Sequence, residues 1–306
     1  PPLTEGRQDT MDSTWRVGFN PLTWYMTPAG SGRAAAPPLP EIYRRIRAAG
    51  FDAVHAEVPD GMSVPDYQAL LADTGLAPAP GYFQARFSDP AAAREAVESG
   101  RRAAAQHTAL GLSRIFIADQ FGAQPRVAVP AQGAGFEEGR LAVIIDNLGV
   151  VAEAMVAEGV TPCLHQHVGT WIETPQETEA VLAAISPDLL LFGPDTGHLA
   201  WAGGDPAAII GAHLDRVGAV HLKDVRAAVR GEAQASGRGY RETTARHVFT
   251  EPGRGDVNFA DVLQVLARFD GWYVVEVDVA DQPTPEDTAR VSAEWVRAQL
   301  AGERAR

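Results

Sequence analysis

The sequence has a single cysteine, Cys163, among its 306 residues, so no disulfide can form within the chain. This composition is typical of a reducing compartment, and we expect a cytoplasmic protein. No apolar run reaches the roughly 18 residues that a membrane span needs, so we expect no membrane partner. Residues 1–13 are polar and lack the apolar stretch of a signal peptide. We interpret them as a disordered leader before one catalytic domain, 14–306.

Basic residues are scarce, and they are nearly all of one kind. The formal net charge is −13, which argues against nucleic acid or an anionic membrane surface as a partner. Of the 26 basic residues, all but Lys223 are arginine. A lone lysine in an arginine-rich chain suggests a site that needs a compact, titratable ammonium where a guanidinium would not fit.

A glycine-rich phosphate loop is also missing after the first predicted strand, where Phe19 is followed by Asn20, Pro21 and Leu22. A nucleotide-binding Rossmann fold is therefore not favoured. Short apolar runs instead alternate with helical periods in eight successive units. The strands are expected at 15–19, 52–57, 77–82, 114–118, 161–164, 189–192, 217–220 and 272–277. This alternation predicts parallel pairing with right-handed crossovers, and eight units in a chain of this length predict a single (β/α)₈ TIM barrel.

Several of the intervening helices have clear start signals. Asp89 precedes Pro90 and is placed to cap a helix, and the residues from Thr174 to Glu177 have the pattern of a capping box. The segment at about 224–255 is long for a connection between a strand and a helix. Its length is typical of a lid, an interface arm or a disordered loop, and its composition does not decide among these.

Side chains with metal-binding chemistry gather where the later strands end, which is where a TIM barrel places its active site. Imidazoles and carboxylates together suit Mn²⁺, Co²⁺, Zn²⁺ or Fe²⁺ better than Ca²⁺. Glu276 and His221 each follow apolar strand residues, where an unpaired polar group would be costly. His55, His107, His213 and His247 are interpreted as ordinary hydrogen-bonded residues. The candidates at the strand ends are His165, His167, Asp195, His198, His221, Lys223 and Glu276.

Three tryptophans fall in connections that follow predicted strands: Trp24, Trp171 and Trp201. They could simply pack the loops. They could also form an apolar wall against the C–H face of a sugar-like ring. The sequence leaves both interpretations open.

Three stretches carry a family resemblance: HQHVGTWIE at 165–173, DTGHLAWAG at 195–203 and VHLKDVR at 220–226. With them the chain resembles the sugar phosphate isomerase/epimerase superfamily, whose barrel is xylose-isomerase-like, and within it the inosose dehydratase group. The resemblance extends from about Val17 to Leu300. It implies a divalent metal held by Asp195, His221 and Glu276. We expect Mn²⁺ first, with Co²⁺, Zn²⁺, Fe²⁺ and Mg²⁺ as alternatives.

The same resemblance implies roles for other residues. His165 stands where many epimerases have a glutamate, and we include it among the metal ligands. In those epimerases two glutamates are thought to shuttle a proton on opposite faces, so a histidine here favours one-sided chemistry such as elimination. His198 matches a substrate-facing position beside the metal, and Glu57 matches a pocket-facing position after the second strand. Arg226 and the three tryptophans complete the expected substrate contacts.

These expectations lead to a metal-dependent lyase that dehydrates a small polyhydroxylated carbonyl compound, a cyclic keto-polyol such as 2-keto-myo-inositol, in inositol catabolism. The metal would stabilise the enolate formed when a base removes the α proton. Glu276 and His198 are candidate bases, and His167 and Lys223 are candidate acids. The alternatives are a ketose epimerase or isomerase, a lyase that eliminates the aglycone of 3-keto-glycosides, and a carbohydrate-binding barrel without activity. By analogy with similar barrels, a homodimer or homotetramer is expected.

Overall fold

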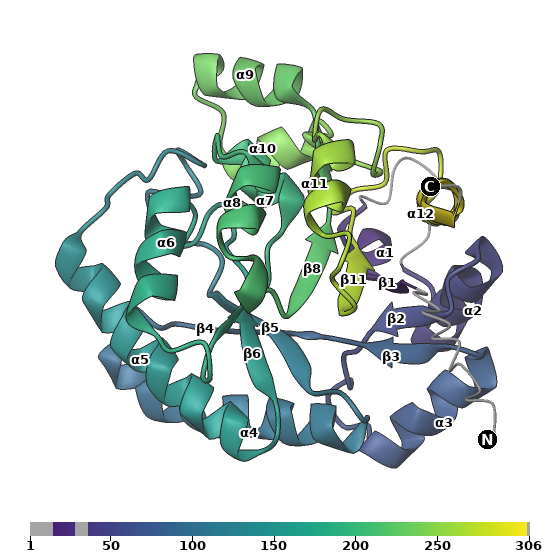
Figure 1. The fold of residues 1–306 in the computed structure, drawn as a ribbon, viewed down its shortest axis with the longest axis horizontal. Coiled ribbons are helices and arrows are strands. Elements are labelled where there is room, and N and C mark those ends of the chain that lie inside the picture. Colours follow the sequence, from purple (N-terminus) through teal and green to yellow (C-terminus); the bar gives the residue numbers. More distant parts are fainter. Residues whose placement is uncertain (1–14, 28–35, 305–306) are drawn as a thin grey trace, which may run out of the picture.

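The computed structural model describes residues 15–27 and 36–304, and the leader expected at 1–13 lies outside the described residues. Parallel strands form the inner wall of the molecule, and helices surround them (Figure 1). The strands of the wall are β1 (Arg16–Phe19), β2 (Ala53–His55), β3 (Ala77–Ala79), β4 (Tyr82–Ala85), β5 (Arg114–Asp119), β6 (Thr161–Leu164), β7 (Leu191–Phe192), β8 (Ala219–Leu222) and β11 (Trp272–Val275).

The wall is a ring made from two sheets. One has the order β3-β2-β1-β11-β8 and the other β4-β5-β6-β7, with parallel pairing throughout both. Two isolated parallel bridges, Phe192 with Val217 and Asp195 with His221, join the β7 edge to the β8 edge. The consecutive strands β3 and β4 connect the sheets on the other side. This arrangement confirms the predicted (β/α)₈ TIM barrel.

The third barrel strand is the one that differs from expectation, because 77–82 is not continuous but divides into β3 and β4 at Pro80 and Gly81. Pro80 has no N–H group to donate to a ladder. A Cβ on Gly81 would lie 2.0 Å from the carbonyl oxygen of Ala56, so only glycine allows this approach. The Gly81 N–H donates to Nε2 of His107 at 3.0 Å instead.

The outer helices follow the strands in the expected rhythm. Thr174 and Glu177 form the predicted capping box, and the Asp89 carboxylate accepts from the Ala91 N–H as a cap. The outer helices are α2 (Leu39–Ala49), α3 (Val64–Thr74), α4 (Ala93–Ala109), α5 (Glu138–Ala157), α6 (Pro175–Ala184), α8 (Pro206–Ala212), α11 (Phe259–Val265) and α12 (Pro285–Arg304). Shorter elements in the connections are α1 (Leu22–Met26), α7 (Thr196–Trp201) and the 3₁₀ turns η1 (Pro90–Ala92) and η2 (Leu214–Arg216).

The interior of the barrel is packed around a fully buried aromatic ring, with partly buried Tyr82, Leu191 and Trp272 at its margin. Phe116 is buried there, and its neighbours are Ala53, Ala79, Cys163, Ala219 and Val274. The Phe116 ring lies 4.0 Å from the His221 ring and 5.8 Å from the His165 ring, measured between centroids. The packed interior therefore forms an apolar floor beneath the strand ends.

The segment expected as a long loop at about 224–255 is folded. It contains β9 (Asp224–Val225), α9 (Ala227–Ser236), α10 (Tyr240–Ala245) and β10 (Phe249–Thr250), and α9 and α10 stand together at one edge of the molecule, on the side away from α3 and α4 (Figure 1). β9 and β10 pair antiparallel and bring the two ends of the segment together. The Asp224 carboxylate also holds the two ends of the segment together, because it accepts from the N–H groups of Gly253, Gly255 and Val257.

None of the helices in the described ranges combines the length and apolarity that crossing a bilayer requires.

Candidate functional site

A group of two histidines and an aspartate lies at the carboxyl ends of three neighbouring strands. His165 follows β6, Asp195 follows β7, and His221 lies within β8. One potential ligand atom from each residue lies within 4.8 Å of the others, and all three residues are buried. Glu276 follows β11 and places Oε2 3.4 Å from Nδ1 of His221. The structure thus brings together the four residues that the sequence suggests as metal ligands.

The unpaired atoms of this group fit a cation. Oδ2 of Asp195, Nδ1 of His165 and both ring nitrogens of His221 are buried and make no hydrogen bond to the described residues. Buried polar atoms in proteins almost always have a partner, so several converging atoms without one are unusual. Nitrogen and carboxylate oxygen donors in this number match the ligands that divalent transition metals take. The residues present therefore fit a divalent metal.

The other oxygen of Asp195 is fixed by the backbone. Oδ1 accepts from the His198 N–H at 2.8 Å, which makes Asp195 the cap of α7. The Gln166 amide also donates to the Asp195 carbonyl at 2.9 Å. Asp195 is thus both the cap of α7 and a residue of the candidate metal site.

The Lys223 ammonium lies within the same cluster. Its Nζ is 2.6 Å from Oε1 of Glu276, 2.7 Å from Oδ1 of Asp278 and 3.8 Å from Oδ2 of Asp195. Burial acts to lower the pKa of Lys223, but these three carboxylates outweigh it and hold that pKa well above its ordinary value. Lys223 is therefore an ammonium at neutral pH.

Glu276 shows the reciprocal effect. Burial acts to raise its pKa, but Lys223, His221 and His165 hold the pKa well below the ordinary value for a glutamate. The side-chain amide of Asn20 donates to Oε2 of Glu276 at 2.5 Å.

A Cβ on Gly197 would lie 2.6 Å from Cγ of Lys223, so a glycine in α7 makes room for the lysine stem.

His167 and His198 stand side by side, with ring centroids 3.9 Å apart. Nδ1 of His167 lies 2.7 Å from the carbonyl oxygen of Val168, which can only accept, so Nδ1 carries the proton and Nε2 of the neutral ring has the lone pair. Nδ1 of His198 lies 3.3 Å from the Val168 N–H, and its Nε2 lies 3.3 Å from Nζ of Lys223. A neutral imidazole has one lone pair, so His198 accepts from only one of these donors at a time. Burial lowers the pKa of both rings.

Residues 43–299 match the family described as the xylose isomerase-like TIM barrel. The chain belongs to that family. A relative named inosose dehydratase, from Lactiplantibacillus plantarum, is 33% identical over 160 residues, which cover 51% of this chain and 53% of the relative. The chain thus spans about half the length of the curated relatives it matches.

Two solved structures share the whole fold at low identity. The probable 3-DHS dehydratase AsbF of Bacillus anthracis superposes with a TM-score of 0.71 at 13% identity, covering 93% of this chain and 99% of that one. A structure titled L-ribulose 3-epimerase superposes with a TM-score of 0.70 at 17% identity, covering 95% and 96%. At such identities these likenesses establish the barrel and nothing about the reaction.

In this xylose isomerase-like barrel a buried ion cluster holds the 165–173 loop. Arg126 donates to both carboxylate oxygens of Glu177, at 3.0 and 2.6 Å, and lies 3.2 Å from Glu173. Glu173 in turn accepts from the N–H groups of Ala131, Gly133 and Gly169. Sequence reasoning did not single out Arg126, because it lies in a connection that carries no recognisable motif.

The structure gives the expected substrate contacts neighbours outside the metal group, and their roles stay predictions. Nε1 of Trp24 donates to Glu286 at 3.0 Å, and the Arg226 guanidinium pairs with Asp281. The Glu57 side chain is exposed just after β2. The Trp171 ring is covered by the guanidinium of Arg140, 3.9 Å from its centroid, with Arg126 at 5.2 Å.

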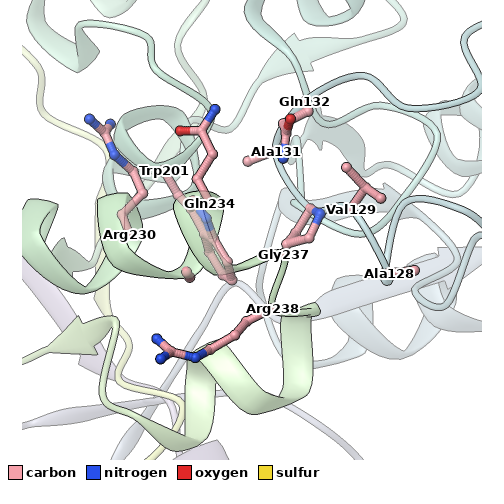
Figure 2. Close-up of a pocket in the computed structure, with 11 residues that line it drawn as sticks. Ala128, Val129, Ala131, Gln132, Trp201, Arg230, Gln234, Gly237 and Arg238 are labelled. Atoms are coloured by element: carbon pink, nitrogen blue, oxygen red, sulfur yellow. The ribbon is translucent and has the colours of Figure 1, made fainter.

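A small pocket lies beside Trp201. The pocket, with a volume of about 50 Å³, lies between α9 and residues 128–132, and Trp201 forms part of its lining (Figure 2). The Trp201 ring also stacks on the ring of Tyr240, 5.0 Å away. Tyr240 itself reaches Asp278 through its hydroxyl. No sequence signal pointed to Tyr240, because it belongs to the segment that we expected to be a loop.

Proposed function

We propose that this protein is a divalent-metal-dependent carbon–oxygen lyase that removes water from a cyclic keto-polyol of the 2-keto-myo-inositol class. The observation that carries the proposal is the buried group of His165, Asp195 and His221 with the Lys223 ammonium beside it. The relative named inosose dehydratase supports the substrate class. We propose Mn²⁺ as the metal, and the dimer or tetramer stays a prediction.

The bound metal would supply Lewis-acid polarisation of the substrate carbonyl, which acidifies the neighbouring C–H bond. His165, Asp195 and His221 would hold it, with Oε2 of Glu276 as a fourth donor. Glu276 can serve the metal and Lys223 together because its two oxygens face different partners. Oε1 lies 2.6 Å from Nζ of Lys223, while Oε2 lies 3.4 Å from Nδ1 of His221.

Side chains of the protein would remove and donate the protons of the reaction. We propose that Nε2 of His167, which has a free lone pair, takes the proton from the carbon next to the carbonyl. This reverses the acid role expected for His167 from the sequence, because Nδ1 donates its proton to the Val168 carbonyl. Lys223 then gives a proton to the leaving hydroxyl as the β carbon–oxygen bond breaks, and one water leaves. Once the product has left and water has entered the site, the proton gained by His167 returns to Lys223 through that water.

The burial of the site supports His167 as the base and Lys223 as the acid. His165, His198, His221 and Lys223 are all less than 2% exposed, so bulk water has little access to the group. In such surroundings the interaction between the ammonium and a leaving oxygen is screened much less than it would be in water. A histidine at 165, where many of the epimerases that the chain resembles have a glutamate, also favours elimination over two-sided proton transfer.

Mass spectrometry of the product tests the proposal. Metal-free protein is reconstituted with Mn²⁺, and separately with Co²⁺, and incubated with 2-keto-myo-inositol. We expect the loss of one water, abolished by a chelator and by His221→Ala but not by His213→Ala, which alters a contact with Glu179 outside the site. An unchanged mass with rearranged stereochemistry would overturn the proposal in favour of an epimerase, and release of an aglycone from 3-keto-glycosides would overturn it in favour of that lyase.

A further inference from the structure

Tyr240 comes from the folded segment between β9 and β10, yet its hydroxyl ends inside the candidate site. It is the first residue of α10 and is 4% exposed. Its hydroxyl donates to Oδ2 of Asp278 at 3.2 Å. The other oxygen of that carboxylate, Oδ1, lies 2.7 Å from Nζ of Lys223. A single carboxylate therefore links the phenol to the ammonium.

The Tyr240 ring is held on several sides. It stacks on Trp201 with an angle of 23° between the ring planes, and Phe121 meets it edge-on with centroids 4.7 Å apart. The Tyr240 N–H donates to the carbonyl oxygen of Val127 at 2.8 Å. These contacts come from α7 and from the connection after β5. A ring packed in this way fixes the direction of its hydroxyl.

The position of the Lys223 ammonium depends on the groups around it. A lysine ammonium sits on a flexible four-carbon stem and takes up whichever acceptors are nearest. Glu276 and Asp278 hold Nζ at hydrogen-bond distance, while Oδ2 of Asp195, one of the unpaired metal-binding atoms, is 3.8 Å away. If Asp278 turned away, the ammonium would lose one of its two close carboxylates and move toward Asp195. There it would compete with a cation for the same oxygen.

We infer that Tyr240 is a positioning residue for Lys223: through Asp278 it keeps the ammonium beside Glu276 and away from the metal-binding oxygen of Asp195. The inference rests on the proposed function in one respect, that Lys223 is the group which protonates the leaving hydroxyl. It also gives the segment 224–255 a role in the reaction, because that segment supplies Tyr240 to the barrel.

The experiment uses the fact that Lys223 is the only lysine of the chain. Protein labelled with ¹⁵N at the lysine Nζ gives one side-chain ammonium resonance, which reports on Lys223 without any substrate. In the unaltered protein we expect a hydrogen-bonded ammonium that is protected from rapid exchange with water. Tyr240→Phe keeps the ring and removes the hydroxyl, and we expect its Lys223 resonance to shift and to exchange faster.

Tyr43→Phe is the matched control, because Tyr43 is also buried and its hydroxyl pairs with that of Tyr67 in the core. We expect this control to leave the Lys223 resonance unchanged. Asp278→Asn breaks the same link from the other side and leaves the Tyr240 ring intact, so it tests the inference if Tyr240→Phe fails to fold. An unchanged Lys223 resonance in folded Tyr240→Phe, or in Asp278→Asn if Tyr240→Phe does not fold, would overturn the inference.

Turnover gives the second measurement. With the substrate of the proposed reaction, Tyr240→Phe should lower kcat about tenfold, the scale of one lost hydrogen bond to a charged group, with little change in KM. The double variant with Asp278→Asn should be no slower than Asp278→Asn alone, because both changes break one link. Fully additive losses would overturn the inference. If the unaltered protein does not release water, the proposed function fails, while the resonance still decides whether Tyr240 positions Lys223.

Discussion

The backbones of Asp195 and His221 form a parallel bridge, and the side chains of the same two residues bring Oδ2 and Nδ1 to 3.6 Å from each other. The contact that closes the barrel between β7 and β8 therefore also assembles two of the candidate metal ligands. Ligands on paired backbones are held more rigidly than ligands on free loops. A metal bound here should accordingly stabilise the closed barrel, since it binds only the folded arrangement.

Removing one of these ligands should abolish metal retention. We expect His221→Ala to lose the metal on dialysis while the unaltered protein retains about one ion per chain, because three donors remain where four converge. Metal content by mass spectrometry measures the change. His213→Ala, at a half-buried histidine outside the site that contacts Glu179, should retain the ion. A His221→Ala protein with full metal content and full activity would contradict the assignment.

Replacing Lys223 by methionine should destabilise the metal-free protein. The change leaves Glu276 and Asp278 buried without their cation, and breaking a buried pair of this kind costs about 3–5 kcal/mol. Urea unfolding in the presence of a chelator measures the loss. Added Mn²⁺ should restore more stability to Lys223→Met than it adds to the unaltered protein, because the ammonium no longer repels the ion. Equal stability of the two proteins without metal would contradict this prediction.

The barrel could be predicted from sequence because its signals are local. Start signals such as Asp89 and Thr174, and the alternation of strand and helix, depend on neighbouring residues and are confirmed. The break at Gly81 could not be predicted, because it depends on the carbonyl of Ala56 and on His107, which are distant in the sequence. Local patterns do not contain such contacts.

The candidate site likewise contains residues that the sequence predicts and residues that it does not. His165, Asp195 and His221 could be predicted because they follow or end strands, and the carboxyl ends of all strands of a barrel lie at the same face. Arg126 and Tyr240 lie in connections whose paths are set by packing, so no periodicity marks them. The direction of the His167 hydrogen bond was equally hidden, because a ring tautomer is set by the neighbouring carbonyl.

Arg126 should matter for stability more than any exposed arginine. Arg126→Met leaves Glu173 and Glu177 buried without a counter-charge, and we expect a loss of about 3–5 kcal/mol in the free energy of unfolding. Arg126→Lys keeps the charge but loses the bidentate hydrogen bond to Glu177, so its loss of unfolding free energy should be intermediate. Arg94→Met, at an exposed pair with Glu98, should cost about 1 kcal/mol or less. Urea denaturation of the three variants measures the order, and an Arg126→Met protein as stable as Arg94→Met would refute the prediction.

His107 should make the protein sensitive to acid. Burial lowers its pKa from 6.5 to about 4, while its ring accepts from the Gly81 N–H and donates to the Ala103 carbonyl. Between these pH values the unfolded chain binds a proton at His107 and the folded chain does not, so stability is full above pH 6.5 and falls as the pH decreases toward 4. The shift corresponds to a loss of about 3 kcal/mol.

His107→Gln isolates this contribution, because the glutamine amide can still accept from Gly81 but does not titrate. Urea unfolding of metal-free protein at several pH values between 4 and 7.5 should give a shallower decline for His107→Gln than for the unaltered chain, by about one proton. The comparison removes the effect of the other buried histidines, His55 among them, because both proteins contain them. Parallel pH profiles for the two proteins would mean that folding does not change the pKa of His107, and would contradict this prediction.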